Sequence, residues 1–121
     1  MTLTNTFLNE TIKLVVGVEM TPPSHIAFSS TVIDMNPAST TLVGEYGPRS
    51  ETNNTHSLNE ATFSAIRSGA LPGSSGDTIN SFGLLSSSSD GLLYAQGLVS
   101  SLLHTSDFDV EVEWRIRLDR R

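Results

Sequence analysis

The sequence predicts an all-β fold, a single antiparallel β-sandwich domain over residues 1–121 with a long C-terminal strand. Residues 107–118, DFDVEVEWRIRL, alternate polar and apolar side chains at every position, which is typical of a strand with one buried face. Other segments rich in β-branched residues recur between turn signals at the spacing of a sandwich, and no segment has a secure helical period. A chain of 121 residues without cysteine is long enough to fold by ordinary packing alone.

The N-terminal part is expected to begin with an arm at residues 1–10. Residues 11–20, TIKLVVGVEM, are rich in β-branched side chains and predict a largely buried strand. Pro22 and Pro23 then end strand pairing. A second strand is expected in residues 24–35, and residues 40–47 are expected to form a short extended piece.

Residues 48–60 contain few apolar side chains and predict an exposed loop or strand edge. The segment that follows, ATFSAIRSG, favours a strand, although SLNE before it matches a helix capping box and keeps a helix as the alternative. Residues 69–77 are expected to form a second exposed loop. Residues 78–99 predict two strands joined by a turn at Asp90-Gly91, because glycine accepts positive φ without steric cost.

The closing segment divides into a core face and a charged face. At twelve residues, its strand is about twice the usual length, so its ends are expected to project from the sandwich or to bend at a bulge. The charged face is the candidate assembly interface, because charges on an exposed strand edge select partners. Its residues are Asp107, Asp109, Glu111, Glu113, Arg115 and Arg117. The expected core residues are Phe63, Ile79, Leu93, Val110, Val112, Trp114 and Ile116.

Composition and charge exclude several partners. With a net charge of −6 and only one lysine, the chain lacks the basic face that nucleic-acid binding needs.

No apolar run approaches the roughly 18 residues that span a bilayer, and the first residues lack the features of a signal peptide, so neither membrane insertion nor secretion is expected. Asn9 and Asn53 begin N-x-[ST] triplets, and whether either is glycosylated stays open.

No catalytic pattern is present, so we expect a protein that is not an enzyme and needs no cofactor. The serines lack the G-x-S-x-G elbow of a hydrolase. GALPGSSGDT lacks the lysine of a phosphate-binding loop. The four acids of the closing strand lie in a line rather than folding inward, which favours a solvated or cross-strand-paired face over a metal site.

The C-terminal half resembles a family of structural proteins from tailed viruses, found in tail fibres, collars and baseplates. The residues that carry the resemblance are Ile79, Gly83-Leu84-Leu85, Asp90-Gly91, Leu93-Tyr94-Ala95, His104-Thr105-Ser106 and the closing Val112-Glu113-Trp114-Arg115-Ile116. Upstream, HIAFSST at 25–31 is similar to the first central strand of that family. LVGEYGPR, with Leu42, Glu45 and Arg49, is similar to its Leu-x-x-Glu-x-x-Arg segment with one extra residue.

The resemblance implies a virion building block, made in the host cytoplasm and located in the tail or baseplate or at a fibre attachment. It implies a homo-oligomer, a trimer or ring, that docks on other virion proteins. The acidic, lysine-poor surface suits a virus of halophilic archaea. A capsid decoration or turret protein and a module that binds host-surface glycans are the alternatives, and contact with the host surface stays open.

Overall fold

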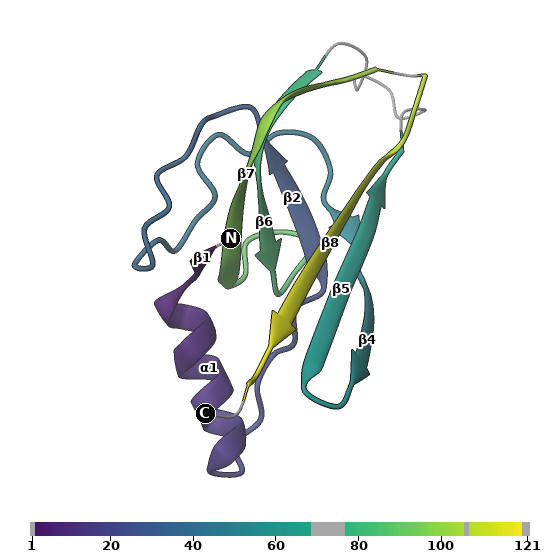
Figure 1. Cartoon of the computed structure of the whole chain (residues 1–121). Helices are drawn as coiled ribbons and strands as arrows, with labels where there is room; N and C mark the ends of the chain where they lie inside the picture. Colours follow the sequence, from purple (N-terminus) through teal and green to yellow (C-terminus); the bar gives the residue numbers. More distant parts are fainter. Residues whose placement is uncertain (1, 69–76, 106, 120–121) are drawn as a thin grey trace.

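The computed structural model describes residues 2–68, 77–105 and 107–119 and contains two antiparallel sheets (Figure 1). The larger sheet has the order β1 (Thr2–Leu3), β7 (Leu93–His104), β6 (Asp77–Leu85), β2 (His25–Ser29), β3 (Ser50–Glu51). The smaller sheet has the order β4 (Asn53–Ser57), β5 (Glu60–Arg67), β8 (Val110–Arg117). Strands make up 47% of the described residues beside one short helix, so the predicted all-β, sandwich-like fold is confirmed.

The core lies on both faces of the larger sheet. Between the two sheets the buried side chains are Ile26, Phe28, Phe63, Ala65, Ile79, Leu84, Ala95, Val110, Val112 and Trp114. The other face buries Ala27, Ile33, Leu42, Leu85 and Leu93, partly beneath the segment that follows β2. All the predicted core residues belong to these clusters, with Ile116 partly buried at the margin.

The predicted hairpin at Asp90-Gly91 is confirmed, and β4 and β5 form a second hairpin that the sequence did not predict. Strands β6 and β7 pair antiparallel, and Asp90 and Gly91 in the loop between them have φ of 52° and 79°. The segment after Ser57 is strand β5 rather than a helix, and it pairs with β4. Leu58 takes the positive φ of this tight turn, 49°, and its side chain is fully exposed.

The prediction of a strand at 11–20 and an arm at 1–10 is wrong. Thr2–Leu3 pairs with β7, and Asn5–Val15 forms helix α1, which packs against β7. Thr4 caps the helix, because its side-chain oxygen accepts from the N–H of Phe7 (3.2 Å). This cap and the 3.6-residue period outweigh the β-branched composition of the segment.

Three expected boundaries also change. Residues 48–60, expected to be an exposed loop or strand edge, contain β3, the fully exposed edge strand β4 and the start of β5. The expected loop at 69–77 lies outside the described residues except for Asp77, which begins β6. The closing strand covers 110–117 rather than 107–118: the His104 ring bonds the C=O of Phe108 (3.0 Å), and Asp107, Phe108 and Asp109 precede the strand.

Arg49 ties the β6–β7 hairpin to the rest of the larger sheet. Its guanidinium forms two bonds to the Glu45 carboxylate (2.7 and 2.9 Å) and donates to the C=O groups of Ser87 and Asp90 (2.8 and 2.7 Å). The hydrogen bond to Glu45 is the largest cause that raises the pKa of Arg49. Glu45 and Arg49, which carry part of the family resemblance, therefore hold a turn in place.

Stability is expected to fall in alkali because of Tyr94. Its hydroxyl donates to the C=O of Thr21, and burial, followed by the nearby Glu10 carboxylate, raises the pKa of Tyr94 to about 12. An unfolded tyrosine ionises near pH ~10. The contribution of the raised Tyr94 pKa to the free energy of unfolding is therefore complete below pH ~10, and it is lost as the pH rises toward 12.

Urea unfolding of the parent and of Tyr94→Phe between pH 8 and 12 checks this expectation. The parent should lose more unfolding free energy over this range than the variant, which lacks the ionising group. An identical pH dependence in the two proteins would contradict it.

Candidate functional site: the open edge of the smaller sheet

Strand β8 is an edge strand. It pairs with β5 on one side, from Glu60↔Arg117 to Arg67↔Val110, and among the described residues no strand pairs with its other side. We call this unpaired side the open edge of β8. Its position follows from the sheet order, in which β8 ends the smaller sheet and β4 ends it at the opposite side (Figure 1).

The hydrogen-bonding pattern identifies the backbone groups on the open edge. Just beyond β8, the N–H of Leu118 donates to the C=O of Asn59 (2.9 Å), continuing the register with β5. Bonded and non-bonded pairs alternate along an antiparallel ladder. The residues that direct N–H and C=O toward the open edge are therefore Glu111, Glu113, Arg115 and Arg117.

These four residues also carry the charged face. All are exposed, whereas Val110, Val112 and Trp114, which alternate with them along β8, are buried. The Arg115 Nε bonds the Glu113 carboxylate at 2.6 Å, and this bond is the largest cause that raises the pKa of Arg115. Arg117 bonds Asp119 at 3.0 Å. The face is acidic toward the start of the strand and basic toward its end.

Of the six residues predicted as the interface, the structure brings four together on β8. Asp107 and Asp109 are exposed as predicted but precede the strand. Whether any of the six contacts another protein stays a prediction.

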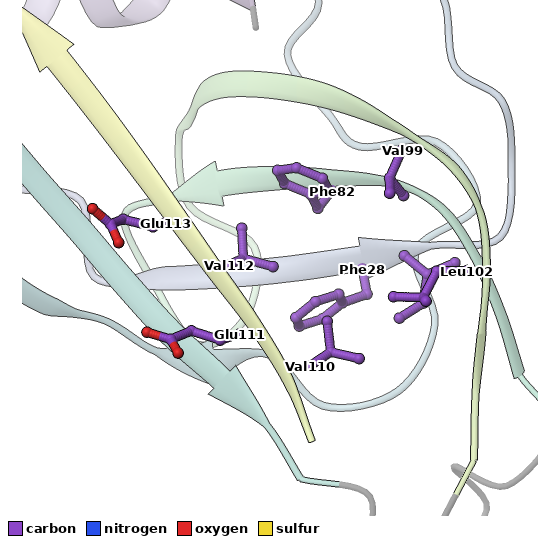
Figure 2. A pocket seen from close by; sticks show the side chains of 9 residues that line it. Phe28, Phe82, Val99, Leu102, Val110, Glu111, Val112 and Glu113 are labelled. Atoms are coloured by element: carbon purple, nitrogen blue, oxygen red, sulfur yellow. The ribbon is translucent and has the colours of Figure 1, made fainter. Parts of the chain in front are cut away.

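An apolar hollow adjoins the open edge. It has a volume of about 230 Å³ and opens between β8 and the larger sheet. We call it the edge hollow; its lining residues are Phe28, Ile79, Phe82, Val99, Leu102, Val110, Glu111, Val112 and Glu113. Figure 2 shows Phe82, Val99 and Leu102 beside β8, with the carboxylates of Glu111 and Glu113 on the opposite side of the strand. The apolar side chains of Phe82, Val99 and Leu102 in the larger sheet are thus only partly covered by β8.

Helix α1 presents a second apolar surface that the sequence analysis missed. Leu8, Ile12 and Val15 are spaced for one helix face and are 58%, 58% and 76% exposed. The side of the helix that faces the protein carries Glu10, which is buried and bonded to Lys13 (2.7 Å). The i, i+4, i+7 spacing of these three residues indicates a helix, but the β-branched residues of the same segment favour a strand.

Comparison with known proteins found no matching family model, curated protein or solved structure. Within the described ranges, no group of three or more histidine, aspartate or glutamate side chains is placed to hold a metal ion. The one helix in this part of the chain, α1, is too short to cross a membrane.

Proposed function

We propose that the protein is a non-enzymatic structural component of a tailed-virus virion, in the tail or baseplate or at a fibre attachment. It acts by associating with copies of itself and by docking on neighbouring virion proteins. The observation that carries the proposal is the open edge of β8, an unpaired backbone edge with a split charged face and an adjoining apolar hollow.

Physical chemistry supports an assembly role for these features. An unpaired edge strand is a template for pairing with another chain, and the charges on it select the partner. Exposed aliphatic side chains grouped on one element, as on α1, are typical of interaction surfaces. The placement in a tailed virus rests on the family resemblance of residues 25–118.

The glycan-binding alternative gains no support from the aromatic residues. Sugar recognition uses exposed aromatic rings beside polar groups, but Trp114 and Tyr94 are buried and Tyr46 is half-buried among core side chains. A capsid decoration role would use the same docking surfaces, so location in the particle separates it from a tail role.

Immunogold electron microscopy tests the proposal, on particles purified from cultures that produce the protein. We expect antibodies against the folded protein to label the tail or its tip, and mass spectrometry to detect the chain in the same particles. Label on the capsid would overturn the tail placement in favour of decoration. Particles that lack the chain would overturn the virion role.

A further inference from the structure

We propose that the open edge of β8 binds the open edge of β8 in a second copy of this chain, antiparallel and about a two-fold axis at Trp114. The two smaller sheets then form one continuous sheet across the contact. This inference rests on the proposed assembly role and names its partner and register.

Backbone geometry limits the registers that are available. In an antiparallel pair, the side chains of residues directly opposite each other lie on the same face, so a charged residue of β8 must face a charged residue of the second copy. The charged residues of β8 are two positions apart, so the midpoint of any such pair is itself a residue. The two-fold axis therefore passes through a residue of β8. The groups needed for the new ladder are the outward N–H and C=O groups of Glu111, Glu113, Arg115 and Arg117.

Charge selects one of these registers. With the axis at Trp114, Glu113 faces Arg115 and Glu111 faces Arg117 of the second copy, and symmetry repeats both pairs. An axis at Glu113 or at Arg115 would place that residue opposite its own copy, with like charges in contact. With the axis at Trp114, each of the four charged residues of β8 thus faces a residue of opposite charge in β8 of the second copy, and no other axis achieves this.

The bonds already made within one copy leave room for these pairs. The Arg115 and Glu113 side chains are 65% and 38% exposed, and Arg117 is 60% exposed. A guanidinium has five donors and a carboxylate about four acceptor sites, so each group can keep its present partner and add another.

The same register supplies an apolar group beside the edge hollow. Leu118 continues the inward-facing series of β8 and is 74% exposed in the single copy. With the axis at Trp114, it lies opposite Val110 of the other copy, which lines the hollow. At each end of the contact, the exposed side chain of Leu118 therefore meets the apolar lining of the other copy's edge hollow.

A two-fold contact of this kind uses the same surface of both copies, so that surface is fully occupied once two copies have bound. The inferred unit is accordingly a dimer, rather than the trimer or ring that the resemblance implies. Such a dimer would be the unit that docks on other virion proteins.

Sedimentation velocity of four forms of the full chain tests the inference. We expect the parent to dimerise. Arg115→Glu/Arg117→Glu, with an all-acidic edge, should bind itself roughly 100-fold more weakly, because four opposite-charge pairs become like-charge contacts. Glu111→Arg/Glu113→Arg, with an all-basic edge, should weaken to a similar extent, and an equimolar mixture of the two should form mixed dimers.

The matched control exchanges all four charges, in Glu111→Arg/Glu113→Arg/Arg115→Glu/Arg117→Glu, and keeps the net charge of the parent. We expect it to dimerise like the parent, and circular dichroism to show all four forms folded. A monomeric parent at millimolar concentration overturns the pairing, as does a folded acidic variant that dimerises like the parent. Either result leaves immunogold labelling of the virion unaffected, so failure of the dimer is distinguishable from failure of the proposed function.

Discussion

Replacing Trp114 with alanine is expected to lower the free energy of unfolding by about 3–5 kcal/mol. Trp114 is 3% exposed and belongs to the core cluster between the two sheets. Its ring meets that of Phe82 edge-on at 5.2 Å, and a Cβ added at Gly97 would be 3.1 Å from the Trp114 ring. Alanine would leave a cavity that this rigid backbone contact prevents from collapsing.

Chemical denaturation of Trp114→Ala and Trp114→Phe measures this effect. Phenylalanine keeps most of the buried area and removes an indole N–H that has no hydrogen-bond partner among the described residues. It should therefore cost clearly less than alanine. If Trp114→Ala unfolds within about 1 kcal/mol of the parent, the core assignment of this face of β8 is wrong.

Replacing Arg67 with alanine is expected to cost about 3 kcal/mol. Arg67 ends β5 and is 2% exposed, with its guanidinium between the rings of Phe28 (5.1 Å) and Tyr46 (4.8 Å). A cation held between aromatic rings away from water contributes about 2 kcal/mol, and removal of the long side chain adds a cavity. The adjoining Gly47 allows the close approach, because a Cβ there would lie 2.9 Å from the guanidinium.

Arg67→Met separates packing from charge. Methionine fills much of the same volume without a cation, so it should recover the cavity part of the loss and leave the cation–π part. Equal thermal and urea stability of Arg67→Ala and the parent would show that the stack contributes nothing.

The parts of the fold that local patterns determine were predictable. Period-two alternation placed Val110, Val112 and Trp114 in the core, and Asp90-Gly91 located the β6–β7 turn, because both signals depend on neighbouring residues only. Helix α1 was missed, because its apolar stripe faces solvent and its β-branched residues favour a strand. Period alone also overextended β8, since Phe108 continues the alternation but is 41% exposed and lies outside the strand.

The candidate site was predictable in composition but not in arrangement. Alternation placed Glu111, Glu113, Arg115 and Arg117 on one face, as the structure has them. That β8 is an edge strand depends on which strand it pairs with, and β5 is distant in the sequence. The edge hollow likewise combines side chains from β2, β6, β7 and β8, which only the folded chain brings together.

Disulfide trapping tests the assembly through β8 most directly, because the chain has no cysteine of its own. With the axis at Trp114, residue 113 lies opposite residue 115 of the second copy at a Cα separation of about 5.5 Å, within reach of a disulfide. Two copies of residue 113 lie diagonally, at about 7–8 Å. Mixing Glu113→Cys with Arg115→Cys under mild oxidation should therefore give a covalent dimer on a non-reducing gel, and each variant alone should give little. No covalent dimer from the folded mixture, or equal cross-linking by one variant alone, would contradict pairing through β8 in this register.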